Sequence, residues 1–202
     1  MKKSPYKLGL TGSIGMGKST TAAMFVEQGV PVWDADSAVA TLYLAGGAGA
    51  KAIAKLVPDA VDETGVNRPK LRAAIQADNA LLGQIEAVIH PLMFADRQAF
   101  FAKHQNDDII LFDLPLLFET GAENWMDGVL VVSASPEIQR ERVLARPGMT
   151  PEFYENILSR QVPDAEKRAK ADWVIDTSHG LDAARQQVLA LLSELRESRR
   201  HA

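Results

Sequence analysis

The residues GSIGMGKS, at positions 12–19, have the types and the spacing of a loop that binds phosphate. They fit the pattern G-x-x-x-x-G-K-S/T at every fixed position. Glycines let the backbone wrap closely around phosphate oxygens, with several N–H groups pointing inward. Lys18 can reach the β- and γ-phosphates, and the Ser19 hydroxyl can ligate Mg²⁺. The spacing therefore predicts a site for a nucleoside triphosphate with Mg²⁺.

The segments around this loop support that prediction. An apolar segment typical of a buried strand, residues 6–11, precedes the loop, and a helical pattern, residues 20–29, follows it. The helix would add its positive N-terminal end to the backbone N–H groups. The alternative interpretation, a glycine-rich turn with a lysine there by chance, is disfavoured because it does not explain the flanking strand and helix. The residues predicted to bind the nucleotide here are Gly12, Ser13, Ile14, Gly15, Met16, Gly17, Lys18, Ser19 and Thr20.

The loop alone does not determine the chemistry, because switches, motors and small-molecule kinases share it. Guanine-specific GTPases usually carry an N-K-x-D element, and in this chain no asparagine is followed by lysine. One sheet with two small insertions also leaves little room for the machinery of a motor. Phosphoryl transfer to a small acceptor fits the length of the chain better.

Two aspartates, Asp34 and Asp36, lie at the end of another apolar segment, residues 30–34. Carboxylates in this place are costly to desolvate unless they are used, and strand ends of this kind face the ligand in open α/β sheets. Asp36 could accept a proton from an acceptor hydroxyl or hold a Mg²⁺-bound water. Alternatively, Asp36 and Ser37 could cap the helix that follows. On an extended strand Asp34 would share a face with Asp36, so we expect it to play a supporting part.

Short apolar segments alternate with helical patterns along the chain. They are rich in Val, Ile or Leu, as buried parallel strands are. The alternation predicts an α/β fold with an open five-stranded parallel sheet and helices on both faces. The five predicted strands are residues 6–11, 30–34, 109–114, 129–133 and 173–176.

Two regions exceed what such a sheet needs. Residues 37–105 are mostly helical and far longer than one crossover requires, so they are predicted to form an inserted substrate-binding domain. Within them, the glycine-rich residues 45–50 would be a flexible break between helices. The nucleotide-binding core would then consist of residues 1–36, 106–145 and 173–202.

The second region, residues 146–172, begins with Pro-Gly and offers Thr150 as the cap of a helix that starts at Pro151. Its later part is polar and contains the basic residues Lys167, Arg168 and Lys170. It could form a mobile lid over an anionic ligand or an ordinary solvated helical hairpin.

Composition limits the partners. The chain has 202 residues, 47% of them hydrophobic, which is enough for one substantial core. A net charge of −4 gives no basic field for nucleic acid, and the absence of cysteine excludes disulfides and cysteine nucleophiles. The chain shows neither a secretory signal nor a run of about 18 apolar residues. We therefore expect a soluble cytoplasmic protein, monomeric or weakly homo-oligomeric, with a small-molecule substrate and no nucleic-acid or membrane partner.

Several motifs then occur in the order found in one family. After the phosphate loop come DAD at 34–36, His-Pro at 90–91 and DLPLLFE at 113–119. They are followed by Gln139, Arg142, Arg146 and finally RAKADWVID. Over residues 7–195 the chain resembles dephospho-CoA kinases. That family transfers the γ-phosphoryl group of ATP to the ribose 3′-hydroxyl of dephospho-CoA, the last step of coenzyme A synthesis.

The resemblance implies a P-loop kinase core, a helical CoA-binding insertion and a lid, with ATP and Mg²⁺ as cofactors. Asp36 matches the position of the family's catalytic base, and Lys18 matches its phosphate-loop lysine. Thr11 and His90 match positions that line the acceptor region. Arg142 and Arg146 match the arginines on the helix that leads into the lid. The resemblance thus implies Asp36, Lys18 and Arg146 as catalytic residues.

The chain departs from the family pattern at three places. Ser13 and Met16 stand where the family often has glycine and serine, at variable positions of the loop. Ala45 stands where a proline often precedes the glycine of the insertion.

Other interpretations of these residues stay open. His90 could simply end a helix before Pro91, since the residue before proline disfavours helix. Arg142 and Arg146 are four apart and would share a helix face, which is also usual for solvated surface. As the better interpretation, they would clamp the triphosphate and stabilise charge in the transition state. Asp113 could orient the Mg²⁺ shell, although the family does not require an acid there.

Two other functions remain as rivals. One is another small-molecule kinase on the same core, such as a nucleotide or shikimate-type kinase, against which the long insertion and the His-Pro dipeptide argue. The other is a non-catalytic module that binds a nucleotide and regulates a partner. Release of ADP that depends on the acceptor would separate an enzyme from such a module.

Overall fold

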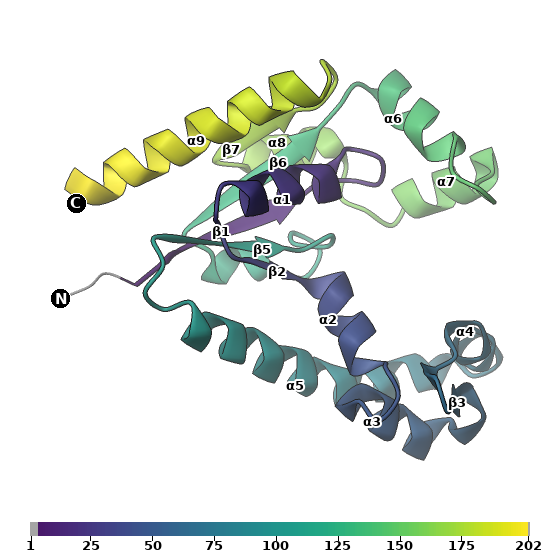
Figure 1. Ribbon diagram of the computed structural model, residues 1–202. Helices are drawn as coiled ribbons and strands as arrows, with labels where there is room; N and C mark the ends of the chain where they lie inside the picture. The colour runs from purple at the N-terminus through teal and green to yellow at the C-terminus, as the bar shows by residue number, and fades with distance from the viewer. Residues whose placement is uncertain (1–3, 202) are drawn as a thin grey trace. The chain divides into compact units, whose positions relative to one another are not determined.

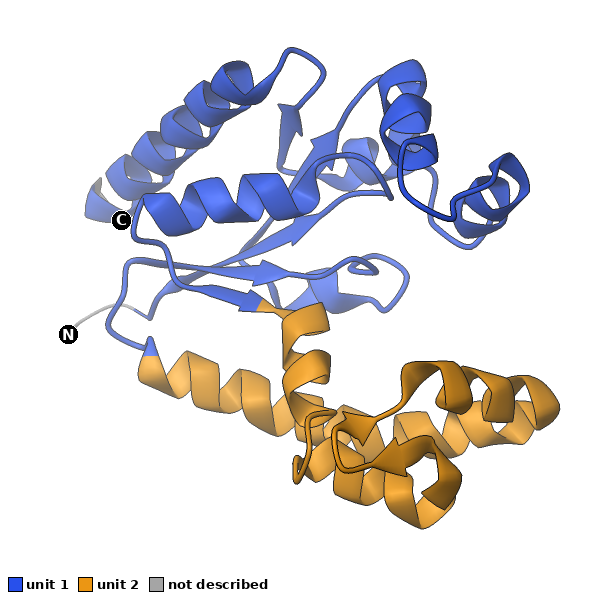
Figure 2. Cartoon of the chain, turned by 45° about the vertical axis from the view of Figure 1, so that its right-hand side comes forward, with its two compact units in different colours: residues 1–33, 104–202 blue, residues 34–103 orange. Residues whose placement is uncertain are grey.

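The computed structural model describes residues 4–201; residues 1–3 and 202, the two ends of the predicted nucleotide-binding core, lie outside the described residues. The chain divides into two compact units (Figure 2). The first unit comprises residues 1–33 and 104–202, and the second comprises residues 34–103. None of the helices within residues 4–201 combines the length and apolar character that crossing a membrane requires.

The first unit is built on a five-stranded parallel sheet with the strand order β2-β5-β1-β6-β7. Leu8 of the central strand lies opposite Leu111 on one neighbour and Gly128 on the other. The predicted α/β fold with five parallel strands is confirmed. The strands are β1 (Tyr6–Thr11), β2 (Val32–Asp34), β5 (Ile109–Asp113), β6 (Gly128–Ser133) and β7 (Trp173–Asp176).

Both faces of this sheet are covered, as the alternation of segments predicts. Helices α1 (Lys18–Glu27) and α9 (Leu181–His201) lie on the same face, where Leu130 and Val132 belong to the shared core (Figure 1). Val129 and Val131 point to the other face and pack with the segment that contains η2 (Ala122–Trp125). Successive β6 side chains thus alternate between two cores, as a strand buried on both sides requires.

The segment predicted as a lid lies within the first unit. After α6 (Pro136–Leu144), it contains α7 (Pro151–Leu158) and α8 (Asp164–Lys170). Thr150 caps α7, because its Oγ1 accepts a hydrogen bond from the Phe153 N–H at 3.2 Å, so the predicted start of this helix is confirmed. Its movement as a lid stays a prediction.

The second unit is mostly helical and has its own core. It also contains a short antiparallel hairpin of two-residue strands, which the sequence pattern did not indicate. Its role in binding CoA stays a prediction. Its elements are α2 (Ala35–Leu42), α3 (Ala48–Leu56), η1 (Pro58–Ala60), β3 (Val61–Asp62), β4 (Gly65–Val66), α4 (Arg68–Ala77) and α5 (Asn79–Lys103).

The glycine-rich residues 45–50 do not form a flexible break along their whole length, and that prediction is wrong for residues 48–50. Helix α3 begins at Ala48, inside this stretch. A Cβ atom added to Gly49 would lie 2.8 Å from the carbonyl oxygen of Leu42. The glycine is therefore needed for the close approach of α3 to the end of α2.

Helix α5 continues through Pro91, so the interpretation that His90 ends a helix is wrong. Proline in a helix interior removes one hydrogen bond and is normally destabilising. Here Leu81, Ile85 and Ile89 recur at four-residue spacing and are buried in the core of the second unit. Burial of this apolar face outweighs the local preference of the proline.

Candidate active site

The phosphate loop connects β1 to α1 and adopts a conformation that only glycine takes readily. Gly15 and Gly17 have φ angles of 79° and 92°, in the left-handed region. A Cβ atom on Gly15 would lie 2.5 Å from Val143 Cγ2 of α6. A Cβ atom on Gly12 would lie 2.6 Å from the carbonyl oxygen of Val132 in β6. The glycines therefore let the loop lie directly against α6 and β6.

Lys18 is held by an acid at the end of the neighbouring strand. Its Nζ donates a hydrogen bond to Oδ1 of Asp113 at 2.5 Å, and Asp113 is fully buried. Taking a carboxylate out of water is costly unless a cation and hydrogen bonds compensate it. Asp113 thus fixes the lysine at the phosphate loop, a connection that the sequence did not predict.

Two loop side chains that depart from the family pattern point into the protein. Ser13 and Met16 are 5% and 2% exposed. The Met16 sulfur accepts a hydrogen bond from the Ala134 N–H at 3.0 Å. The backbone N–H of Met16 donates a hydrogen bond to the Ser13 carbonyl oxygen at 3.2 Å. Both side chains therefore contribute to the packing of the loop.

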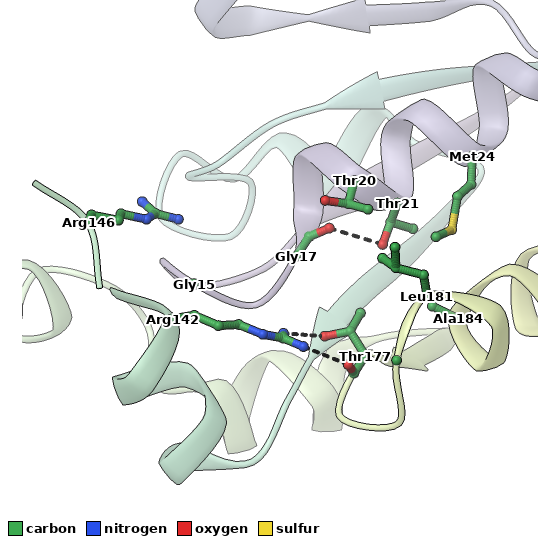
Figure 3. A pocket seen from close by; sticks show the side chains of 11 residues that line it. Gly15, Gly17, Thr20, Thr21, Met24, Arg142, Arg146, Thr177, Leu181 and Ala184 are labelled. Atoms are coloured by element: carbon green, nitrogen blue, oxygen red, sulfur yellow. Dashed lines mark hydrogen bonds between the residues drawn. The ribbon is translucent and has the colours of Figure 1, made fainter. Parts of the chain in front are cut away.

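A cavity of about 320 Å³ lies beside the loop (Figure 3). Its walls come from the loop and α1, from α6 and the turn after it, and from the segment between β7 and α9 together with the start of α9, all in the first unit. This volume is in the range of small-molecule sites in proteins. The cavity is lined by Gly15, Gly17, Thr20, Thr21, Met24, Arg142, Arg146, Thr177, Gly180, Leu181 and Ala184.

Arg142 and Arg146, the two predicted arginines, both line this cavity, one from a helix and the other from the turn that follows it. Arg142 lies in α6, whereas Arg146 lies beyond the helix, which ends at Leu144. The prediction that the two share a helix face is therefore wrong. The turn after the helix, closed by the Arg146 N–H on the Val143 carbonyl oxygen at 3.1 Å, changes the direction of the chain.

Arg142 is fixed by Thr177, a residue that the sequence did not single out (Figure 3). Its two terminal nitrogens donate to Thr177 Oγ1 at 2.9 Å and to the Thr177 carbonyl oxygen at 2.8 Å. The Thr177 hydroxyl also lies 2.9 Å from the carbonyl oxygen of Met16 in the phosphate loop. Thr177 directly follows the last predicted strand, at the edge of the sheet where ligands bind in folds of this kind. This position could have identified it as a site residue from the sequence.

Asp34 and Asp36 have different structural roles. Asp34 caps α2, because its Oδ1 accepts a hydrogen bond from the Ser37 N–H at 2.6 Å. Asp36 lies in the first turn of that helix and is exposed, so the prediction that Asp36 and Ser37 form the cap is wrong. The two aspartates also do not share a strand face, since the helix begins at Ala35.

The two residues predicted to contact the acceptor lie in different environments. Thr11 ends β1 and is fully buried, with its hydroxyl donating to the Pro115 carbonyl oxygen at 3.3 Å. It thus ties the end of β1 to the segment that follows β5. His90 lies on α5 in the second unit and is exposed. Substrate contacts by either residue stay predictions.

Lys167, one of the basic residues of the region predicted as a lid or a solvated hairpin, is not solvated, so the solvated interpretation is wrong for this residue. It is fully buried, with Nζ 3.0 Å from Oε1 of Glu119, and the same oxygen accepts a hydrogen bond from the Val162 N–H at 2.8 Å. Burial raises the pKa of the Glu119 carboxyl, but the hydrogen bond from Val162 and the ammonium of Lys167 bring it below its usual value. A polar helix of seven residues gave no indication of this buried pair.

Solved structures with a similar fold include several kinases. The crystal structure of TT1252 from Thermus thermophilus has a TM-score of 0.82 and 32% identity, covering 96% of this chain and 99% of that one. A dephospho-CoA kinase from Campylobacter jejuni has a TM-score of 0.67 and 21% identity, covering 95% and 97%. A shikimate kinase from Bacteroides thetaiotaomicron has a TM-score of 0.51 and 14% sequence identity, covering 93% of this chain and 98% of that one. The last two likenesses show the fold alone.

The sequence matches the family model of dephospho-CoA kinase over residues 6–183. The dephospho-CoA kinase of Cereibacter sphaeroides is 54% identical over 194 residues, 96% of this chain and 98% of that protein. The dephospho-CoA kinase of Mesorhizobium japonicum is 53% identical over 194 residues, covering 95% and 98%. The chain therefore belongs to the dephospho-CoA kinase family, whose members catalyse the final step of coenzyme A biosynthesis by phosphorylating dephospho-CoA.

Proposed function

We propose that the protein transfers the γ-phosphoryl group of ATP to the 3′-hydroxyl of the ribose in dephospho-CoA, which gives coenzyme A. The observation that carries this proposal is the cavity that the phosphate loop shares with Arg142 and Arg146. It combines backbone N–H groups at a helix N-terminus with two cationic side chains, and this is what a triphosphate requires. Membership of an ATP-dependent kinase family supports the same donor.

ATP would lie along the cavity with its base against the apolar side chains of Met24, Leu181 and Ala184. Its phosphates would follow the loop from Gly12 to Thr20. Lys18, placed by Asp113, would contact the β- and γ-phosphates. Because the transferred group carries dispersed negative charge, Lys18 and Arg146 would stabilise the transition state electrostatically.

Mg²⁺ is the expected companion of ATP, and the oxygen donors beside the loop suit it. Ser19, exposed in the first turn of α1, would offer its hydroxyl as a ligand, and the buried Asp113 carboxylate at the end of β5 would orient the hydration shell of the ion. Hard oxygen ligands of this kind, completed by phosphate oxygens and water, are what Mg²⁺ prefers. When bound, the ion would neutralise charge on the β- and γ-phosphates.

Asp36 is the proposed general base on the acceptor side. Its carboxylate would take the proton of the 3′-hydroxyl as that oxygen forms a bond to the γ-phosphorus. The bond from the γ-phosphorus to the β–γ bridging oxygen then breaks, and ADP leaves. Asp36 follows β2 by two residues, and such strand ends face the ligand in sheets of this kind.

The remaining predictions complete this proposal. Thr11 and His90 would contact the acceptor, residues 37–105 would bind the rest of dephospho-CoA, and residues 146–172 would close as a lid. The protein would act in the cytoplasm as a monomer or weak homo-oligomer, without a nucleic-acid or membrane partner. The cysteine-free composition supports this location, and the net charge of −4 supports the absence of a nucleic-acid partner.

Acceptor-dependent release of ADP tests the function against its rivals. Purified protein with ATP and Mg²⁺ should release ADP rapidly with dephospho-CoA and slowly with nucleoside monophosphates, shikimate or no acceptor. Faster release with another acceptor would make the protein a different small-molecule kinase. ATP binding without acceptor-dependent release would favour a non-catalytic module.

A further inference from the structure

Ile14, the third residue of the phosphate loop, is held from two sides by glutamine side chains. Gln139 of α6 donates a hydrogen bond from Nε2 to the Ile14 carbonyl oxygen at 2.8 Å. Gln161, which follows α7, accepts a hydrogen bond from the Ile14 N–H at 3.2 Å through its Oε1. We call this pair of side chains the glutamine clamp. The N–H and the carbonyl oxygen of Ile14 are thus both hydrogen-bonded to side chains, one just before and one just after residues 140–160.

The Gln139 side of the clamp is rigid because α6 lies directly against the loop. Gln139 is only 6% exposed. A Cβ atom on Gly15 would lie 3.1 Å from the Gln139 carbonyl oxygen, which shows how closely this turn of α6 approaches the loop. Arg142, three residues further along α6, lies on the same side of the helix and lines the cavity. The clamp and the arginine are therefore positioned by the same helix turn.

The Gln161 side is fixed by the residues that come directly after it. The Val162 N–H donates to Glu119, which pairs with the buried Lys167. Two residues later, Oδ2 of Asp164 accepts a hydrogen bond from the Ser133 hydroxyl of β6 at 2.7 Å. These contacts fix the backbone directly after Gln161, and the hydrogen bond with Ile14 places its side chain at the phosphate loop.

We propose that Gln139 and Gln161 are positioning residues for the phosphate transfer. They fix the two peptide groups on either side of the Ile14 Cα atom, so that the N–H groups of the following glycines stay directed at the phosphates of ATP. A loop with glycines at positions 12, 15 and 17 has much conformational freedom, and restricting it before binding improves affinity. This inference rests on the proposed binding of ATP phosphates by the loop.

Methionine at either position tests the clamp, because it has a similar length and neither donates nor accepts an amide hydrogen bond. We expect Gln139→Met and Gln161→Met each to raise the KM and the Kd for ATP about tenfold. The KM for dephospho-CoA should stay unchanged. Because both side chains hold the backbone of the same residue, Ile14, the double variant should show less than the product of the two single effects.

The matched control is Gln186→Met, at an exposed glutamine on α9 in the same unit. Thermal unfolding without nucleotide checks that each variant is folded. Gln161 is half-buried, so Gln161→Met decides the question if Gln139→Met yields little folded protein. A purely structural role would lower the unfolding temperature and leave the KM for ATP at the control value.

Two results would overturn the inference. One is an ATP affinity of both clamp variants equal to that of Gln186→Met. The other is tighter ATP binding by Gln161→Met, which would mean that Gln161 competes with phosphate for the Ile14 N–H. Lys18→Met separates this outcome from failure of the proposed function. If Lys18→Met loses ATP binding and the clamp variants keep it, only the clamp is wrong; if Lys18→Met also keeps it, the proposed phosphate site is wrong.

Discussion

Asp34 and Asp36 are only two residues apart, and the local backbone gives their carboxylates different tasks. Asp34 has extended backbone angles, φ −104° and ψ 118°, so its side chain can turn back and cap α2. Asp36 is already helical and exposed, in the first turn of α2. The Asp34 side chain is therefore engaged as a helix cap, whereas the exposed Asp36 carboxylate is the one that we propose as the base.

Substitution of the two aspartates by asparagine should separate these tasks. Asp36→Asn removes the proposed base and should lower kcat by about 10²- to 10⁴-fold with little change in the Kd for ATP. Asp34→Asn keeps a capping oxygen and should lower kcat far less. Steady-state kinetics and ATP titrations measure both effects. Equal losses of kcat in the two variants, or collapse of ATP binding in Asp36→Asn, would contradict this assignment.

At the scale of elements, the segment after α7 is attached to the core by a buried ion pair. The Glu119 side chain is 16% exposed and the Lys167 side chain is 0% exposed. Removing one partner of such a pair leaves an uncompensated buried charge, whereas replacing both by apolar residues often does not destabilise. Lys167 therefore depends on Glu119 for its place in α8.

Glu119→Gln should reduce the free energy of unfolding by about 3 kcal/mol at pH 7, because Lys167 then has no carboxylate partner. The pKa of Glu119 is lowered in the folded protein, so its contribution is complete above the unfolded-state pKa of about 4.3. The contribution is lost as the pH falls through the lower folded-state pKa. Urea unfolding at pH 7 and below pH 4 should show the difference between wild type and Glu119→Gln shrinking in acid.

The double variant Glu119→Leu/Lys167→Met is the matched control for this pair. It removes both charges and should be closer to the wild type in stability than Glu119→Gln at pH 7. A deficit of Glu119→Gln that is the same at both pH values would show that the charge of Glu119 is not what stabilises the segment.

Elements were predictable from the sequence where one local pattern decides the structure. The five strands are short, mostly apolar segments, of which β5 and β6 are buried along their whole length, and the start of α7 follows from Thr150 and Pro151. Where packing overrides local preference, prediction failed, as for the glycines that begin α3 and for Pro91 inside α5. The hairpin of β3 and β4 was missed because strands of two residues carry no periodic signal.

The site was predictable only in part, for the same reason. The phosphate loop follows from a fixed spacing, and the arginines follow from a family motif. The side chains that hold them in place, Asp113 on Lys18 and Thr177 on Arg142, are contacts between residues far apart in the sequence. No local pattern encodes such contacts, since they depend on which strand ends lie side by side in the sheet.

At the scale of the whole molecule, the first unit contains the complete set of residues proposed to hold ATP. The proposed base Asp36, His90 and the predicted CoA-binding residues belong to the second unit. In this proposal, the residues that hold ATP and those that meet the acceptor belong to different compact units of one chain, except for Thr11 of the first unit. This division predicts that substitutions in the phosphate loop alter the KM for ATP, whereas substitutions on α5 alter the KM for dephospho-CoA.

The most direct test of the central claim is the identity of the product. The purified protein is incubated with dephospho-CoA, ATP and Mg²⁺, and the acceptor is analysed by mass spectrometry and by NMR of the ribose. We predict one added phosphoryl group, located on the 3′-hydroxyl, with one ADP formed for each acceptor converted. An unmodified acceptor, or a phosphoryl group at another position, would contradict the function assigned to this site.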